Sequence, residues 1–221
     1  TGEAEVNVVG YCAGGLLSLL WAASAGEAGP AHLVTFTTPA DFHEMPQFQA
    51  WSNRAVFDVD RLVDALGNVP SDIIMTSFEM LRPAQRIATH LRLLDNLWND
   101  DFVKSHRMFD RWGMDALPLP GEYFRDMTKQ LMWDNALITG TLRLAGRPVD
   151  LGAVRAPYLH ITAQHDHIVP PPASAPLIGL VGSADKQQVE LKGGHVSLIA
   201  GPNAMRRMWP LVDQWMSERS L

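Results

Sequence analysis

The fold of this 221-residue chain is decided by the stretch Gly10-Tyr11-Cys12-Ala13-Gly14-Gly15. An apolar run typical of a β-strand precedes it at residues 6–9, and a run typical of a helix follows it at residues 16–24. Cys12 is the only cysteine of the chain. Glycines two positions before and two positions after it leave room for a sharp turn in which Cβ atoms would clash. The pattern predicts a thiol held exposed between a strand and a helix.

Two interpretations of Cys12 compete. A free cysteine is often buried as a small apolar side chain, and outside a motif that is its commonest role. The glycine frame between an apolar strand and a small-residue helix start favours an exposed nucleophile instead. The frame resembles the nucleophile turn of α/β-hydrolases, with sulfur where those enzymes usually carry a serine hydroxyl.

Composition limits the class of protein. With 47% hydrophobic residues the chain can bury the core of an ordinary domain, and a formal charge of −6 argues against non-specific nucleic-acid binding. A single cysteine excludes an internal disulfide, and no apolar run approaches the roughly 18 residues of a transmembrane helix. Residues 1–5 lack the basic and apolar regions of a secretory signal. These features predict a cytoplasmic protein with no transmembrane segment and no nucleic-acid partner.

Four strands are predicted near the two ends of the chain, at residues 5–9, 33–37, 157–162 and 187–191. With the helical runs between them they predict an α/β core over residues 1–40 and 136–221, in which helices flank a mostly parallel sheet. The nucleophile strand of an α/β-hydrolase normally lies in mid-sheet, after several other strands. The sequence therefore predicts the C-terminal part of an α/β-hydrolase fold, with upstream strands missing and an unpaired sheet edge along residues 5–9.

Residues 41–135 are predicted to form a helical insertion, because they hold helical patterns and no clear strand. Their many aromatic and methionine side chains favour a cap or lid over the active site, although a plain helical core explains the same composition. A final helix is predicted to begin at Pro202 and to pack on the sheet. The side chains predicted to be buried by it follow helical spacing: Met205, Met208, Trp209, Val212, Trp215 and Met216.

A carboxylate and a histidine follow later strands, in the order in which α/β-hydrolases place the partners of their nucleophile. Asp166 follows the strand at residues 157–162, and His195 follows the strand at residues 187–191. Each has a simpler explanation, because Asp166 can stabilise a turn and His195 can be a partly buried histidine bonded to the backbone. Since parallel strands end at one edge of a sheet, Cys12, Asp166 and His195 are predicted to converge there.

The residues around Asp166 invite one further interpretation. His165 and His167 flank it and could serve as metal ligands. The sequence offers no matching cluster of further ligands, so no metal site is predicted.

Cys12, Asp166 and His195 are predicted to have different roles in the reaction. His195 takes the thiol proton, Asp166 orients the imidazole, and the backbone N–H of Ala13 is the one identifiable donor to an oxyanion. A thiolate exchanges readily with activated acyl groups to give an acyl-enzyme of similar energy. Cys12 in place of serine therefore favours acyl transfer over hydrolysis.

Seven segments spread over nearly the whole chain resemble polyhydroxyalkanoate synthases, and above all the catalytic subunit of the two-subunit, class III-like enzymes. The segments are residues 10–15, 34–42, 67–70, 78–83, 149–151, 166–171 and 193–195. The glycine-cysteine box, the Asp-His-Ile-Val-Pro loop and the Gly-Gly-His loop are specific as a set, while any one of them alone is weak.

The resemblance implies an enzyme that polymerises (R)-3-hydroxyacyl-CoA, such as 3-hydroxybutyryl-CoA, into polyester with release of coenzyme A. It implies that Cys12 holds the growing chain as a thioester, that His195 acts as general base, and that Asp166 assists in activating the 3-hydroxyl. The coenzyme A thioester is then a substrate, and no cofactor is implied. The expected partners are a second, non-catalytic synthase subunit and a second copy of the chain, and the expected location is the surface of a polyester granule in the cytoplasm.

Two other functions stay open at the level of the sequence. A cysteine-dependent hydrolase, such as an esterase, thioesterase or polyester depolymerase, would use the same three residues. A non-catalytic granule-binding fragment would keep the fold without the reaction, and the missing upstream strands favour this for the isolated segment.

Overall fold

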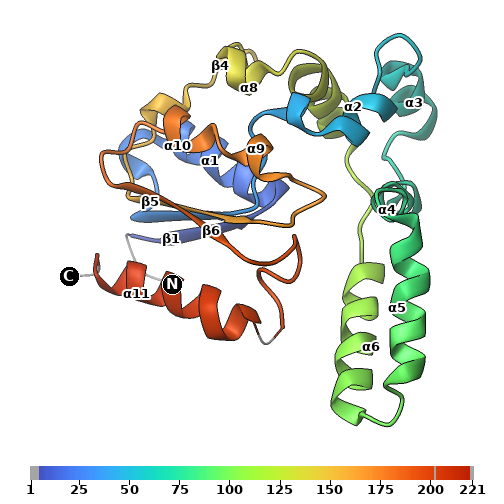
Figure 1. The fold of residues 1–221 in the computed structure, drawn as a ribbon. Coiled ribbons are helices and arrows are strands. Elements are labelled where there is room, and N and C mark those ends of the chain that lie inside the picture. Colours follow the sequence, from blue (N-terminus) through green and yellow to red (C-terminus); the bar gives the residue numbers. More distant parts are fainter. Residues whose placement is uncertain (1–4, 202, 220–221) are drawn as a thin grey trace. The chain divides into compact units, whose positions relative to one another are not determined.

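The computed structural model describes residues 5–201 and 203–219 (Figure 1). The chain divides into two compact units. The first comprises the described residues up to Asn53 together with those from Gln130 onward, and the second is Arg54–Lys129. The first unit contains a parallel sheet, whereas the described elements of the second are helices joined by loops.

Four parallel strands form the sheet of the first unit, in the order β1-β2-β5-β6. Their bounds are β1 Asn7–Tyr11, β2 His32–Phe36, β5 Tyr158–Ala163 and β6 Lys186–Leu191. Each overlaps the stretch predicted for it, and the predicted α/β fold with a parallel sheet is confirmed. Among the described residues β1 pairs with β2 alone, so its other side is an unpaired edge, as the sequence predicted.

The two central strands are buried on both faces. Every residue of β5 is buried, and so is every residue of β2 except His32. Strands covered on both faces read as nearly continuous apolar runs rather than as alternating ones. The central position of these two strands explains their sequence pattern. The same position fixes the direction in which their C-terminal ends leave the sheet.

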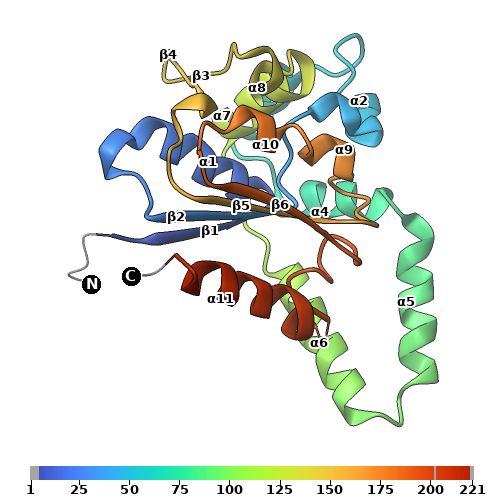
Figure 2. The same cartoon turned by 60° about the vertical axis from the view of Figure 1, so that its left-hand side comes forward.

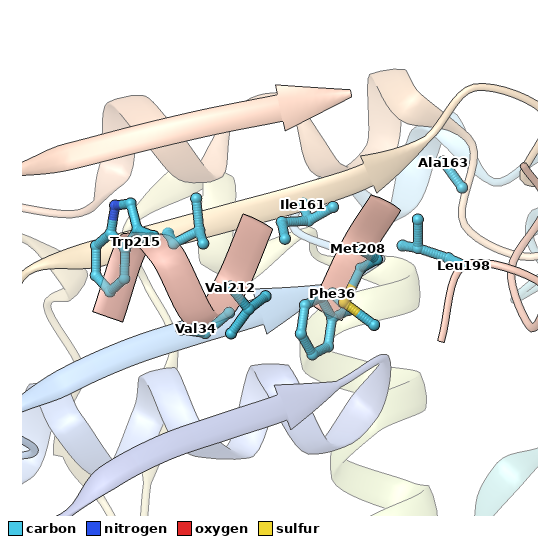
Figure 3. Close-up of a cluster of buried hydrophobic side chains, with 9 residues drawn as sticks. Val34, Phe36, Ile161, Ala163, Leu198, Met208, Val212 and Trp215 are labelled. Carbon is cyan, nitrogen blue, oxygen red and sulfur yellow. The ribbon is translucent and has the colours of Figure 1, made fainter. Parts of the chain in front are cut away.

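One face of the sheet packs against α11 (Trp209–Ser217), as Figure 2 shows. Alternate residues of β2 and β5 point to this face and meet the helix in one apolar cluster (Figure 3). Its buried members are Val34, Phe36, Leu159, Ile161, Ala163, Leu198, Met208, Val212 and Trp215. Full burial of a large apolar side chain contributes about 1.5–3 kcal/mol. The cluster therefore anchors the strands from whose ends the candidate site is built.

The start of the terminal helix differs from the prediction. Ala204–Met208 (η5) forms a π-helical segment ahead of α11, and a π-helix turns more widely than an α-helix. The wider turn breaks the predicted spacing, so Met205 is 67% exposed and Trp209 is 38% exposed, while Met208 is buried. The prediction that Met205 belongs to the core is wrong. Pro202, where the helix was predicted to begin, lies outside the described residues.

The opposite face of the sheet is covered by α1 (Ala13–Ala25) and α10 (Leu177–Leu180), as Figures 1 and 2 show. From α1 the side chains of Leu16, Leu19 and Leu20 are buried. The remaining short elements around this sheet are η1 Gly26–Ala28, β3 Arg143–Leu144, β4 Arg147–Pro148, η4 Leu151–Ala153 and α9 Pro171–Ser174. Strands β3 and β4 form a separate antiparallel pair. Since α1 begins directly after Cys12, its packing fixes the position of the cysteine turn.

Residues 41–53 and 130–135 belong to the first unit, although the sequence assigned them to the helical insertion. Their elements, with the one that follows, are η2 Phe42–Glu44, α2 Pro46–Trp51, η3 Met127–Trp133 and α8 Ala136–Thr139. Asn135 ties the two segments together. Its Nδ2 donates to Oδ1 of Asp41 at 2.8 Å, and its Oδ1 accepts from the N–H of Phe42 at 3.1 Å. These bonds explain why the second unit is shorter at both ends than the insertion drawn from the sequence.

The second unit contains five helices among its described residues: α3 Val59–Leu66, α4 Ser71–Met80, α5 Pro83–Asp95, α6 Asp100–Met114 and α7 Gly121–Asp126. Helices α3 and α7 contact each other, and α3 buries Val59 and Val63. Arg125 of α7 forms ion pairs with Asp60 and Asp64 of α3. Within the part of the chain that the structure describes, none of the helices combines the length and apolar character needed to cross a membrane.

Candidate active site

Cys12 lies at the tip of a sharp turn between β1 and α1. Its backbone φ of 53° falls in the region that favours glycine, a conformation that costs about 1–3 kcal/mol and persists only when neighbouring contacts impose it. Those contacts are present, because the Cys12 N–H donates to the Phe36 carbonyl at 2.9 Å and the Cys12 carbonyl accepts from the N–H groups of Gly15 and Leu16. The cysteine is half-buried rather than enclosed. The alternative that Cys12 is a fully buried small hydrophobe is therefore wrong.

Close packing requires two of the three glycines in this turn. A Cβ on Gly10 would lie 2.5 Å from Cα of Gly15, and a Cβ on Gly15 would lie 1.9 Å from Oγ1 of Thr38. A Cβ on Gly14 would meet nothing within 4 Å. The expectation that Gly14 leaves room for the turn is wrong. Because α1 begins at Ala13, Gly14 faces outward and the close approach falls one residue later.

Asp166 follows β5 and uses its two carboxylate oxygens differently. Oδ1 accepts from the N–H groups of Ile168 and Val169, each at 2.9 Å. Oδ2 accepts from Nδ1 of His195 at 2.6 Å. The carboxylate thus stabilises its own turn and binds the histidine at the same time, so the turn-stabilising interpretation of Asp166 does not exclude a role beside His195.

His195 follows β6, in a loop that is tied to the Asp166 loop by a bond from the His165 N–H to the Gly193 carbonyl at 2.8 Å. Burial lowers the pKa of His195, but hydrogen bonds to the side chains of Asp166 and Cys12, together with the charges of these groups, outweigh burial and raise the pKa to about 9. With Nδ1 engaged by Asp166, Nε2 is the ring nitrogen left to face Cys12. The structure brings the three side chains together from loops at the C-terminal ends of β1, β5 and β6.

Ala13 is the first residue of α1 and is exposed beside Cys12. The N–H groups in the first turn of a helix have no intrahelical acceptor, and the helix dipole makes that end positive. The Ala13 N–H therefore fits the position of an oxyanion donor next to the thiol.

Sequence reasoning missed one neighbour of the site, Tyr11. Its ring lies 4.9 Å from the ring of His195, centroid to centroid, at an interplanar angle of 45°. The signal was present in the sequence, because Tyr11 stands between Gly10 and Cys12 in the cysteine box. Only the fold reveals that a residue 184 positions later packs against it.

A second buried histidine shows what distinguishes His195. His160 lies in β5 on the opposite face from the apolar cluster, with Nδ1 bonded to Oγ1 of Thr35 at 2.8 Å. Burial lowers the pKa of His160 to about 4, because its neighbour is a neutral hydroxyl and not a carboxylate. His160 is thus a neutral core histidine, whereas His195 is built to hold a proton.

His165 and His167 flank Asp166 in the loop after β5. His165 is exposed and His167 is half-buried. Among residues 5–201 and 203–219 there is no group of three or more histidine, cysteine, aspartate or glutamate side chains that could hold a metal ion.

Comparison with protein families and known sequences agrees with the α/β fold. A family model described as "alpha/beta hydrolase fold" matches residues 1–202. The chain is 30% identical over 222 residues to the "Poly(3-hydroxyalkanoate) polymerase subunit PhaC" of Haloferax mediterranei, covering 100% of this chain and 45% of that protein. It is 33% identical over 220 residues to the protein of the same name from Allochromatium vinosum, covering 99% of this chain and 61% of that protein. The chain thus spans about half the length of the curated relatives it matches, and its resemblance to these polymerases extends over its whole length.

Solved structures show the same fold at lower sequence identity. The monoacylglycerol lipase of Paleococcus ferrophilus matches with a TM-score of 0.52 and 16% identity, over 98% of this chain and 69% of the lipase. A thermophilic esterase from Thermogutta terrifontis matches with a TM-score of 0.51 and 15% identity, over 99% of this chain and 66% of the esterase. At such identities the likeness shows the fold alone.

Proposed function

This chain belongs to the α/β-hydrolase family, and from that premise we propose that it is the nucleophile-bearing part of a polyhydroxyalkanoate synthase. The reaction is acyl transfer, in which (R)-3-hydroxyacyl-CoA, for example 3-hydroxybutyryl-CoA, is polymerised and coenzyme A is released. The whole-length similarity to proteins named poly(3-hydroxyalkanoate) polymerase supports the polymer class. The presence of sulfur at the nucleophile position supports transfer through a thioester.

One observation carries the proposal. His195 bridges a buried carboxylate and the only thiol of the chain, with Asp166 on Nδ1 at 2.6 Å and Cys12 contributing to its raised pKa. Because its pKa is raised to about 9, the imidazole of His195 can take a proton from the neighbouring sulfur and hold it at neutral pH.

In the acylation step, the Cys12 thiol gives its proton to the imidazole of His195, and its sulfur attacks the thioester carbonyl carbon of the substrate. A carbon–sulfur bond to Cys12 forms and the carbon–sulfur bond to coenzyme A breaks. The negative charge that develops on the carbonyl oxygen faces the Ala13 N–H at the N-terminus of α1. The imidazolium of His195 gives its proton to the departing sulfur, which leaves free coenzyme A and a neutral imidazole.

In the elongation step, the neutral imidazole of His195 takes the proton of the 3-hydroxyl of an incoming 3-hydroxyacyl-CoA. The hydroxyl oxygen attacks the thioester on Cys12, so an ester bond forms and the Cys12 thiolate leaves. Asp166 assists this activation, because it orients the imidazole and stabilises the imidazolium that forms. The lengthened chain is then a coenzyme A thioester that can acylate Cys12 again, so one thiol suffices for the cycle.

The proposal extends to the surroundings of the enzyme. Coenzyme A enters as part of the substrate, and the residues of the site need no cofactor for these steps. A second, non-catalytic synthase subunit, a second copy of the chain and the growing polyester are the partners that we propose. The proposed location is the surface of a polyester granule in the cytoplasm.

The test is incubation of the expressed protein with 3-hydroxybutyryl-CoA, with separate assays for free coenzyme A, polymer and 3-hydroxybutyric acid. The proposal expects polymer and coenzyme A. Monomeric acid with coenzyme A and no polymer would instead identify a cysteine-dependent hydrolase. Absence of coenzyme A release, with a Cys12 that resists alkylation, would identify a non-catalytic granule-binding protein.

Matched variants sharpen this assay. Cys12→Ala should abolish both coenzyme A release and polymer, while Leu17→Ala, on the exposed side of α1, should retain them. Cys12→Ser tests the role of sulfur, because a serine hydroxyl is a weak nucleophile at neutral pH and exchanges poorly with thioesters. A Cys12→Ser variant that polymerises normally would contradict the thioester mechanism.

A further inference from the structure

Tyr11 is the last residue of β1 and the immediate neighbour of Cys12. Its ring packs against the ring of His195, with centroids 4.9 Å apart and an angle of 45° between the planes. The same ring packs against the buried apolar cluster of the sheet. Tyr11 therefore connects the rigid core directly to the imidazole.

The hydroxyl of Tyr11 does not account for this placement. Its oxygen is buried, and it has no hydrogen-bond partner within the described ranges 5–201 and 203–219. Burial raises the pKa of Tyr11, and the charges of Cys12 and Asp166 raise it further, so the phenol stays neutral. In the structure the phenol bonds to no side chain of the site, so the ring is the part of Tyr11 that contacts His195.

The imidazole of His195 needs such a support. Asp166 holds Nδ1 through one hydrogen bond, and one bond leaves the ring free to tilt about that contact. The residues before it, Gly193 and Gly194, have no side chains to restrain the loop, and a Cβ on either would meet nothing closer than 3.4 Å. An aromatic ring packed against the imidazole restricts the tilt.

We propose that Tyr11 is a positioning residue, whose ring holds the imidazole of His195 with Nε2 toward Cys12. The proposal rests on the proposed function in one respect, namely that Cys12 and His195 work as a pair. The titratable groups that the structure places around His195 are Asp166 from the loop after β5, Cys12 from the turn before α1, and Tyr11 from β1. Burial raises the pKa of Tyr11, so its phenol stays neutral.

The experiment measures the rate at which iodoacetamide alkylates Cys12 as a function of pH, in the unmodified protein and in five variants: three at Tyr11, a control at Trp209 and a reference at His195. Tyr11→Phe keeps the ring and removes the hydroxyl. Tyr11→Leu and Tyr11→Met remove the ring, and Met fills the space with a flexible apolar side chain in case the Leu variant fails to fold. Trp209→Leu is the matched control, because Trp209 packs edge-on to Phe36 in the same unit, with ring centroids 5.9 Å apart, and its removal also deletes an aromatic pair.

We expect Tyr11→Phe to alkylate within about twofold of the unmodified protein at every pH, since the aromatic pair is kept. Tyr11→Leu and Tyr11→Met should alkylate roughly three- to tenfold more slowly at neutral pH, the fold-change that corresponds to the loss of one aromatic pair. Their pH profiles should also shift toward that of His195→Gln, whereas Trp209→Leu should keep the profile of the unmodified protein.

Two results would overturn the proposal. One is a pH profile of folded Tyr11→Leu or Tyr11→Met that coincides with that of the unmodified protein. The other is a Tyr11→Phe variant as impaired as the ring-free variants, because the hydroxyl would then be the active part. The alkylation assay needs no acyl-CoA, so a failure of polymer synthesis in the unmodified protein would count against the proposed function and not against this contact.

Discussion

The two units of the molecule use apolar side chains in different ways. In the first, strands and helices alternate along the chain and bury a continuous apolar cluster between the sheet and α11. In the second, α4, α5 and α6 have no buried residue, and apolar side chains on α5 such as Ile87, Leu91 and Leu94 are more than half exposed. Helical periodicity is present in both units. It therefore predicts a helix, whereas burial depends on a second surface that faces the helix.

The two units also differ in how far their paired charged side chains are buried. In the first unit Asp166 and His195 form a buried pair with 0% and 5% of their side chains exposed. In the second unit Arg125 is paired with Asp60 and Asp64, whose side chains are 48% and 71% exposed. Charges in a buried pair interact strongly and shift pKa values, while exposed pairs are screened by water and salt. The reaction is thus expected to depend on the first unit, and changes in the second unit are expected to have smaller effects.

The largest effect is expected from Asp166→Asn. Asparagine keeps an oxygen for the N–H groups of Ile168 and Val169, but it presents an amide to His195 and no longer stabilises imidazolium. We expect coenzyme A release from 3-hydroxybutyryl-CoA to fall by about 10⁴-fold. The control is Asp150→Asn, because Asp150 accepts from the Gly152 N–H in a similar turn without a histidine. Equal activity of the two variants would contradict the role of Asp166.

The glycines of the cysteine turn provide the next test. Gly15→Ala puts a Cβ 1.9 Å from Oγ1 of Thr38, so we expect the free energy of unfolding to fall by about 3 kcal/mol. Gly14→Ala adds a methyl group in open space on the first turn of α1, and we expect a gain of about 0.5–1 kcal/mol. Urea unfolding of both variants measures the difference. A Gly15→Ala variant as stable as Gly14→Ala would show that the turn is looser than described.

The pH dependence of stability is expected to follow His195. Its pKa is raised from 6.5 to about 9 in the folded protein, so folding retains a proton that the unfolded chain releases. This contribution, about 3 kcal/mol, is fully present below pH 6.5 and is lost as the pH rises through about 9. Urea unfolding measures the free energy of unfolding of the unmodified protein and of His195→Gln, below pH 6.5 and above pH 9. The difference in free energy between the two proteins should be smaller at the higher pH. A difference that is constant or grows with pH would refute the assignment.

The smallest effect is expected in the second unit. Arg125→Gln removes the ion pairs of Arg125 with Asp60 and Asp64 between α7 and α3, and we expect a small fall of the melting temperature that disappears at high salt. Arg86→Gln, which breaks the exposed pair of Arg86 with Glu79, should have less effect still. A loss of stability in Arg125→Gln as large as that in Gly15→Ala, at any salt concentration, would contradict this expectation. It would mean that the second unit depends on its ion pairs more than the exposure of the paired side chains indicates.

What the sequence could predict depends on how local the signal is. The central strands β2 and β5 have an apolar pattern of their own because they are buried, and Cys12, Asp166 and His195 were found because each follows a strand of the parallel sheet. The contact of Tyr11 with His195 could not be found in this way, since it joins the last residue of β1 to the loop after β6, and these strands are the two edges of the described four-stranded sheet. For Met205, a π-helical turn shifted the spacing on which the prediction relied.

The most direct test of the central claim is the intact mass of the protein after brief incubation with 3-hydroxybutyryl-CoA. The account expects the mass to rise by one or more 3-hydroxybutyryl groups, on the peptide that contains Cys12, and expects hydroxylamine to remove them as it does other thioesters. The Cys12→Ala variant should show no such mass. Release of coenzyme A without any adduct on Cys12, or an adduct of the same mass in Cys12→Ala, would contradict the account.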